Sequence, residues 1–435
     1  MRNISKNKKI LFLIVSIVLL IIDNGYCQEK ILSLEECLNI AEKNNFELTT
    51  QQYKIKEATS KYNQEVSNIL PQLDVNLSYF RYDWQPPSKK SLFGASLDDY
   101  YAELSLKQVL FGGGKYIARI DSAQYSLAAE TVKYDQIRNT IYLSVKKAYY
   151  EQLRAQFALK TQQKLIDKLN EQYKISQLLY NSGKTTNLDV LKIQTQIAAA
   201  EDAIDNLKNL VYTKALLLGQ IMGSNEPVNA SFILPAIREN MKINTNCIDN
   251  QFKENPELKY INNLVKKSEY DIAVESGEMY PTLFLRGNYY FEDKVFFPGN
   301  PNWYVGLGLS FPIYHGGAIA SKIEQAVYRN NQLVETQKQI RLGLAVRFQS
   351  ARATVIDKLN RLKTTKKVLD LSKEALIAAE LKYNVGKITA TELLDAQTVW
   401  LNSELNYFNN IIDVQISLAE IENICPKAIS WEAGE

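Results

Sequence analysis

Three carboxylates stand near the start of predicted helices, in two places that share one sequence pattern. Thr186 is followed three residues later by Asp189, and Thr389 is followed by Glu392. This is the spacing of a capping box, in which an acidic side chain accepts a hydrogen bond from the backbone at the start of the helix. Asp395 lies about one helical turn beyond Glu392, and no cap requires it. Asp395 therefore suggests that the carboxylates in this place have a role other than helix capping.

Few other residues in the chain offer chemistry. The single histidine, His315, argues against a histidine-based metal site and against Ser-His-Asp catalysis. Four cysteines lie far apart and form no metal or redox motif, so we expect buried or incidental thiols. The net charge of +3 over 435 residues indicates no particular partner. We expect no enzyme activity, no cofactor, no metal and no nucleic acid. The cysteines are Cys27, Cys37, Cys247 and Cys425.

The carboxylates belong to two segments that repeat each other. Tyr180–Leu191 aligns with Tyr383–Leu394 without a gap, at an offset of 203 residues. Each segment predicts a helix that ends, a tight turn, and a second helix. Gly183 and Gly386 lie where the end of a helix favours a left-handed residue. A duplicated helical hairpin therefore positions the carboxylates at its two tips.

Long helices are predicted on both sides of each tip. No proline interrupts residues 115–181 or 318–384, and a helix of 67 residues would be about 100 Å long. Apolar residues recur in places at spacings of three and four, which is typical of a coiled coil with a narrow apolar seam. Pro71 and Pro281 end two shorter helices. The remaining helices are expected at about 46–70, 187–222, 256–280 and 390–425.

Four segments alternate apolar and polar residues, which predicts strands with one apolar and one polar face. A transmembrane β-barrel has this pattern, with lipid outside and water inside. The alternative is two hairpins on a soluble core, because the signal of each strand is weak. Phe284 interrupts the polar side of its strand. The strands are expected at about 72–82, 101–111, 282–292 and 302–311.

The barrel interpretation assigns a side to each strand residue. We expect lipid contact for Leu73, Val75, Leu283, Val305 and Leu307. We expect the lumen to be lined by Asp74, Asn76, Glu103, Arg286 and Ser310.

The N-terminus is predicted to be a targeting segment. Basic residues precede an apolar run at 10–22, whose 13 residues are too few to span a membrane as a helix and suit a signal peptide. Gly25-Tyr26-Cys27 offers a cleavage site after Cys27. Lipidation of Cys27 is the alternative, although Asn24, Gly25 and Tyr26 match a lipoprotein signal poorly. Export is expected in either case.

Four strands cannot close a barrel alone, and an open sheet edge is not viable in lipid. Three copies would supply twelve strands, so a trimer is the economical closure. The predicted fold is mainly α with a β-barrel portion, internally duplicated, forming a 12-stranded barrel and a 12-helix tunnel as a trimer. We divide the chain into a signal peptide at 1–27, a first repeat at 28–222, a mid-height linker at 223–251, a second repeat at 252–425 and a C-terminal tail at 426–435.

The chain resembles the TolC family of outer-membrane efflux and secretion channels over essentially the whole mature sequence. The resemblance rests on the two tip segments, on the strand-to-helix junction Phe311–Gly317, and on the order helix, two strands, long helix, return helix. It implies a homotrimer whose barrel lies in the outer membrane of a Gram-negative bacterium, in contact with lipid, and whose helical tunnel extends into the periplasm. It also implies that a periplasmic adaptor (membrane fusion) protein and an inner-membrane pump are its partners.

The resemblance further implies roles for residues at the tips. Glu392 and Asp395 match carboxylates that project into the narrow periplasmic entrance. Asp189 and Tyr383 match an acidic residue and a tyrosine that help to hold this entrance shut. The alternatives are that Asp189 and Glu392 only cap their helices and that Tyr383 only packs against its neighbours. The tips are expected to dock on the adaptor through Asn181, Gly183, Lys184, Asn384, Val385, Gly386 and Lys387.

One position departs from the family pattern. A basic gating residue of some members falls at Ile388, which leaves Lys387 as the neighbouring cation. The expected function is a passive exit duct of a tripartite efflux or type I secretion system. The alternative is a non-transporting periplasmic scaffold or adaptor built of coiled coils, against which the four alternating strands argue. The sequence does not distinguish drugs, metal ions or polypeptides as cargo, nor one class of pump from another.

Overall fold

The computed structural model describes residues 30–84, 86–87, 89, 94, 96–233, 241–243, 252–296, 301–425 and 429–431. The predicted signal peptide, much of the linker and most of the C-terminal tail lie outside these ranges. The chain divides into two compact units. Unit 1 holds residues 1–45, 141–237 and 355–418, and unit 2 holds residues 46–140, 238–354 and 419–435. None of the described helices combines the length and apolar character needed to cross a bilayer.

The helices repeat in pairs of equal length, which confirms the internal duplication. The two long helices, α5 (Lys115–Asn181) and α8 (Ala318–Asn384), each contain 67 residues. The return helices, α6 (Asn187–Ile221) and α9 (Ala390–Ile424), each contain 35 residues. The shorter helices, α3 (Phe46–Ser67) and α7 (Pro256–Gly277), each contain 22 residues. A further helix, α2 (Leu34–Asn44), begins with the capping box of Ser33 and Glu36.

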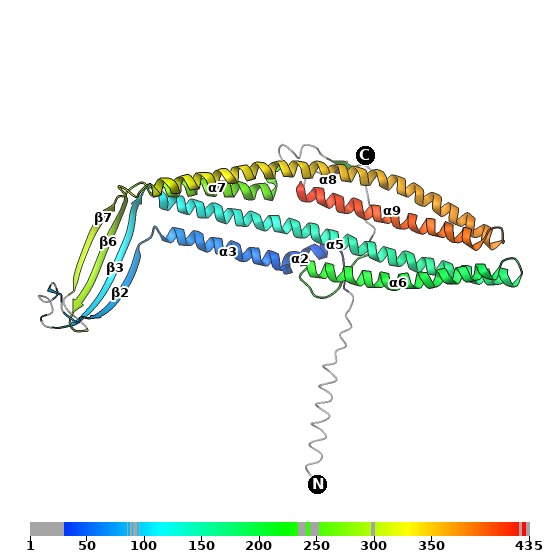
Figure 1. Cartoon of the computed structure of the whole chain (residues 1–435), viewed down its shortest axis with the longest axis horizontal. Coiled ribbons are helices and arrows are strands. Elements are labelled where there is room, and N and C mark those ends of the chain that lie inside the picture. The colour runs from blue at the N-terminus through cyan, green and yellow to red at the C-terminus, as the bar shows by residue number, and fades with distance from the viewer. Residues whose placement is uncertain are drawn as a thin grey trace, which may run out of the picture. The chain divides into compact units, whose positions relative to one another are not determined.

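Four antiparallel strands form one sheet within unit 2. They are β2 (Gln72–Arg81), β3 (Asp98–Gly112), β6 (Thr282–Asp293) and β7 (Asn302–Ser310). The strands lie side by side in the order β2-β3-β6-β7 (Figure 1). The two halves of the chain therefore meet where β3 pairs with β6. β2 and β7 are the edges of this sheet.

The register of the sheet separates the alternating residues into two faces. One row across the four strands holds Val75, Leu104, Tyr289 and Trp303. The next row holds Asn76, Glu103, Tyr290 and Asn302 on the opposite face. All five residues expected to contact lipid lie on the first face, and all five expected in the lumen lie on the second. We call these the apolar face and the polar face of the sheet.

Two small sheets join distant segments within each unit. In unit 1, β1 (Lys30–Leu32) pairs in parallel with β4 (Val228–Ala230). In unit 2, β5 (Met241–Ile243) pairs antiparallel with β8 (Ile429–Trp431), which ties the linker to the C-terminal tail. A short 3-10 helix, η2 (Phe252–Glu254), precedes α7.

The cysteines differ from each other in their chemistry. Cys37 is a buried free thiol on α2, and burial raises its pKa to about 12. Cys425, just beyond α9, is disulfide-bonded, so the expectation of an incidental thiol was wrong at this position. The physical reason is that an exported chain meets an oxidising compartment, in which disulfides persist. Cys27 and Cys247 lie outside the described residues.

Each unit has a narrow core built from helix seams. In unit 1, the rings of Phe157 and Phe408 stack with centroids 3.7 Å apart, joining α5 to α9. In unit 2, Phe252 meets Phe348 of α8 edge-to-face at 6.2 Å. Many other helix positions are polar and exposed, as expected for helices that bury only a stripe. The long helices are therefore held by repeated small contacts along their seams.

Candidate functional site

Both hairpin tips, which lie in unit 1, end their long helix with the same backbone motif. The amide of Gly183 donates to the carbonyl of Tyr180 at 2.9 Å, and the amide of Lys184 donates to that of Leu179 at 2.9 Å. The second tip repeats both bonds: the amide of Gly386 donates to the carbonyl of Tyr383 at 2.8 Å, and the amide of Lys387 donates to that of Lys382 at 2.9 Å. This pair of bonds is a Schellman motif, which requires a left-handed residue. Gly183 has φ = 72° and Gly386 has φ = 74°, so glycine is needed at both turns.

The helices that follow the tips begin differently. At α9, the backbone amide of Thr389 donates to the Glu392 carboxylate at 2.8 Å, and the amide of Glu392 donates to the Thr389 hydroxyl at 3.3 Å. This completes a capping box. The Thr389 hydroxyl in turn donates to the Glu392 carboxylate at 3.0 Å. The bonds that the carboxylate accepts from the Thr389 amide and hydroxyl hold the pKa of Glu392 below its ordinary value.

At α6 the corresponding box does not form. The Asp189 carboxylate accepts hydrogen bonds from the hydroxyls of Thr185 at 2.6 Å and Thr186 at 3.3 Å. The side chain of Thr186 makes no cap bond to the backbone. Aspartate is one methylene shorter than glutamate, and here it binds the hydroxyls of the turn instead. Asp189 therefore stabilises the turn in this structure. The prediction that Thr186 and Asp189 form a capping box was wrong.

An apolar cluster packs the two tip hairpins together. Its most buried large members are Tyr383, Leu393 and Ile193, drawn from α8, α9 and α6. Ile388 packs against this cluster, half buried. A basic side chain at this half-buried position would lose part of its hydration, so an apolar residue suits it better. The full cluster is Leu179, Ile193, Leu376, Tyr383, Ala390, Leu393 and Trp400.

Tyr383 is buried rather than presented at the surface. Its side chain is 1% exposed, and its hydroxyl has no hydrogen-bond partner among the described residues. Burial raises the pKa of this phenol, the nearby Ser176 side chain acts to lower it, and the charge of Asp189 adds to the increase. The structure thus brings Tyr383 and Asp189 into one neighbourhood without a bond between them. Asp395 and Glu392 are both exposed, three residues apart along α9.

Polar bonds that the sequence did not reveal also join the two hairpins. Gln397 donates to Gln172 at 2.5 Å, and both side chains are buried. Lys168 of α5 pairs with Glu380 of α8 at 2.7 Å. Gln172 lies eleven residues before Gly183, and Gln397 lies eleven residues after Gly386. This equal distance from the two glycines is the signal in the sequence that points to the glutamine pair.

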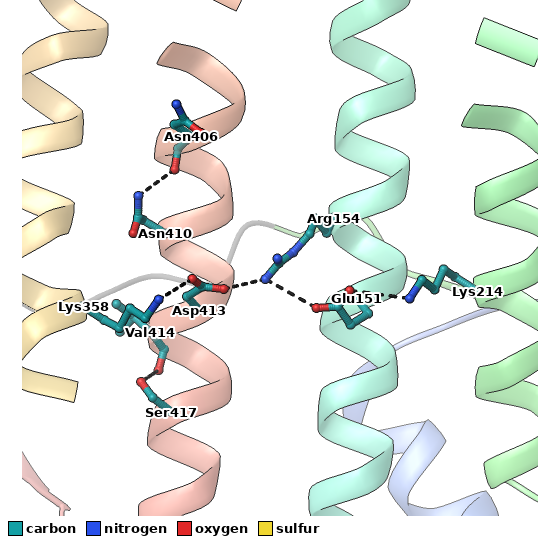
Figure 2. Close-up of polar contacts among 9 residues, drawn as sticks. All are labelled: Glu151, Arg154, Lys214, Lys358, Asn406, Asn410, Asp413, Val414 and Ser417. Atoms are coloured by element: carbon teal, nitrogen blue, oxygen red, sulfur yellow. Dashed lines mark hydrogen bonds and ion pairs between the residues drawn. The ribbon is translucent and has the colours of Figure 1, made fainter. Parts of the chain in front are cut away.

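Farther along unit 1, a chain of five alternating charges crosses four helices. Figure 2 shows Asp413 of α9 between Lys358 of α8 and Arg154 of α5. Asp413 accepts from Lys358 at 2.8 Å and from Arg154 at 2.6 Å. Arg154 also lies 3.4 Å from Glu151, which lies 3.7 Å from Lys214 of α6. We call these five residues the charge network.

Asp413 is the centre of the charge network. Its burial raises the pKa, but the hydrogen bonds and charges of Lys358 and Arg154 outweigh burial and hold the pKa below its ordinary value. One carboxylate therefore fixes α8 and α5 against α9. Within the described ranges, no group of three or more His, Cys, Asp or Glu side chains is placed to hold a metal ion.

Comparisons with known proteins identify the family. The model of the outer membrane efflux protein family matches residues 37–224 and 248–425. Outer membrane protein TolC of Escherichia coli (strain K12) is 24% identical over 399 residues, covering 84% of this chain and 77% of that protein. Alkaline protease secretion protein AprF of Pseudomonas aeruginosa is 22% identical over 371 residues, covering 77% and 74%.

Solved structures share the fold. A structure of CusC has a TM-score of 0.80 at 14% identity, and covers 92% of this chain and 94% of its own. The outer membrane protein VceC from Vibrio cholerae has a TM-score of 0.78 at 16% identity, covering 90% and 95%. The expected fold of one chain (mainly α with a β portion and internally duplicated), the outer-membrane location and the function as an exit duct for efflux or secretion are thereby confirmed. The chain belongs to the outer membrane efflux protein family.

Proposed function

We propose that three copies of this chain close into one duct, which an inner-membrane pump serves through a periplasmic adaptor. The observation that carries the proposal is the four-stranded sheet with one apolar and one polar face. Its edge strands β2 and β7 each pair on one side only among the described residues. Backbone groups left unpaired in lipid cost several kcal/mol each, so both edges need a partner. Pairing β7 of one copy with β2 of the next satisfies every edge after three copies.

The tips are the proposed adaptor surface. The seven tip residues assigned to docking are all exposed, and Val385 exposes 60% of its surface. Their backbone is held rigidly by the two Schellman motifs. Rigid, exposed turns that carry an apolar side chain (Val385) and lysines (Lys184 and Lys387) suit recognition by another helical hairpin.

The proposed gate lies at the start of α9. Glu392 and Asp395 are exposed and unpaired by any described cation, so three copies of each can surround a shared axis. We further propose that Asp189 and Tyr383 support the closed state, Tyr383 by packing and Asp189 by holding the first turn. Capping by Glu392 is compatible with a place at the entrance, because the carboxylate keeps its charge while it caps.

Single-cysteine labelling tests the duct. Val75→Cys and Asn76→Cys are neighbours on β2 that lie on opposite faces. A charged, membrane-impermeant thiol reagent should modify Asn76→Cys in intact outer membranes and leave Val75→Cys unmodified, because lipid covers the apolar face. Cys37 adds little background, since its thiol is buried and its pKa is about 12.

The same samples report the oligomer. The unheated protein should migrate as a trimer in a denaturing gel and as a monomer after boiling. Leu307→Cys and Ser310→Cys repeat the comparison on β7 as an independent pair. Modification of Val75→Cys and Leu307→Cys, with protection of Asn76→Cys and Ser310→Cys, would contradict the assignment of the two faces. Recovery of the chain in the soluble periplasmic fraction would favour the scaffold alternative.

A further inference from the structure

Two cations face each other across the polar face of the sheet. Lys107 of β3 is the register partner of Arg286 of β6, and both side chains are exposed. Like charges directly opposite on neighbouring strands destabilise a sheet. No described carboxylate lies within ion-pair distance of either cation. The pair is therefore not explained by the stability of the sheet.

The two carboxylates nearest to these cations on the polar face do not pair with them. Glu103 accepts from the amide of Asn76 at 3.4 Å and from the amide of Asn288. Asp74 is the register partner of Ser105, whereas the register partner of Lys107 is Gln72. Asp74 is therefore a diagonal neighbour of Lys107, in the next row of the same face. The row that holds Lys107 and Arg286 is thus locally positive.

Phe284 explains how Arg286 is held without a carboxylate. This residue interrupts the polar alternation of β6, and its ring lies over Gly308, so closely that a Cβ at Gly308 would overlap it. The Arg286 guanidinium lies 5.5 Å from the centre of the Phe284 ring. A cation over an aromatic face is stabilised by the ring, while its N–H donors stay free. Gly306, the register partner of Arg286 on β7, leaves the space beside it open.

We propose that Lys107 and Arg286, with Phe284 as the platform, bind multivalent oxyanions inside the duct. The ligand class follows from the donors: a guanidinium fork and an ammonium side by side match the oxygens of phosphate groups. In the trimer, three such pairs surround the lumen and focus a positive potential. The inference rests on the proposed function, because it requires the polar face to line a closed barrel.

Block of single-channel current by tripolyphosphate tests the site. The purified channel is placed in a planar bilayer, and tripolyphosphate is added on the side of the β2–β3 and β6–β7 loops. Wild-type current should be blocked in a voltage-dependent way. Lys107→Gln with Arg286→Gln should raise the blocking concentration about tenfold or more, since each charge-assisted contact to an anion is worth about that factor.

Three variants separate the site from net charge. Lys107→Arg keeps the charge and should keep the block. Phe284→Leu keeps both cations but removes the platform, and should weaken the block by a smaller factor. Lys54→Gln with Lys56→Gln removes the same charge from exposed positions of α3 and should leave the block unchanged.

Failure of the anion site and failure of the proposed duct would give different results. A conducting trimer that is blocked equally before and after Lys107→Gln with Arg286→Gln would overturn the anion site and leave the duct standing. Loss of block in the α3 variant instead would place the anion elsewhere and would also overturn the site. A wild-type protein that forms no conducting trimer would overturn the proposed function, and the anion site with it.

Discussion

At the scale of single residues, Asp413 has the most consequential contacts. It is the one carboxylate shared by Lys358 and Arg154, which belong to two other helices. Removing its charge leaves two cations close together, each partly withdrawn from water. Such a shared acceptor is worth more than an exposed ion pair, because both donors lose their partner at once.

We expect Asp413→Asn to destabilise the helical hairpins of unit 1 by about 1–3 kcal/mol at neutral pH. The pKa of Asp413 is lowered in the folded chain, so its contribution is present above the ordinary value of 3.8 and is lost as pH falls through the lower folded value. The difference between wild type and variant should therefore shrink below pH 3.8. Thermal loss of the helical circular-dichroism signal, measured across pH, checks this.

The matched control is Asp205→Asn. Asp205 pairs with Lys208 one turn away on α6, and its side chain is 76% exposed. Exposed pairs of this kind contribute about 0–1 kcal/mol, so this variant should unfold almost like wild type. Equal effects of the two substitutions on thermal unfolding would show that the charge network does not stabilise the contacts between the helices of unit 1.

At the scale of elements, the two tips are the same turn built twice. Each combines a left-handed glycine with a Schellman motif, and each reverses a 67-residue helix into a 35-residue one. The apolar cluster beneath them holds the hairpins together without needing either glycine. A change at the turn should therefore alter the tip surface more than the helices behind it.

We expect Gly386→Val to abolish export while the trimer still assembles. A β-branched residue at φ = 74° costs about 1–3 kcal/mol, so the turn will change shape and present Val385 and Lys387 wrongly to the adaptor. Export of a pump substrate and in vivo cross-linking to the adaptor measure the two consequences. Gly343→Val is the control, because Gly343 lies inside α8 with open space around its Cβ position. Normal export and cross-linking in the Gly386 variant would argue against docking through this tip.

At the scale of the whole molecule, the trimer turns single carboxylates into a ring. Three copies of Glu392 and Asp395 around a narrow entrance would focus a negative potential, as rings of acidic residues do in cation-selective pores. This ring and the basic row at Lys107 and Arg286 belong to different units of the chain. The acidic ring would attract cations, and the basic row would attract anions.

We expect Glu392→Gln with Asp395→Asn to reduce cation selectivity in planar bilayers and to relieve block by a trivalent cation added on the tip side. The trimer should remain assembled, because neither carboxylate is buried. Thr389→Val provides a finer test. It removes one donor that lowers the pKa of Glu392, so selectivity should fade at a higher pH than in wild type as the solution is acidified. Selectivity and block that survive the double substitution would place the ring at other residues.

Much of this architecture is determined by the sequence itself, because its signals are local. Helix ends follow from glycine and capping residues within one turn, as at Gly183 and Gly386. Strand faces follow from the alternation of neighbouring side chains, and the register confirms that Val75 and Asn76 lie on opposite faces. The duplication is visible in the sequence because the two tip segments align at a constant offset of 203 residues.

The tertiary structure alone decided which distant residues meet. The bonds of Gln172 with Gln397 and of Asp413 with Arg154 depend on the axial register of one helix against another, which no local pattern encodes. The position of the Phe284 ring depends on Gly308, its register partner on β7, where a Cβ would overlap the ring. Asp189 was expected to cap its helix, but its shorter side chain found the turn hydroxyls instead. Long-range packing selects among several locally acceptable partners, and only the assembled fold makes that selection.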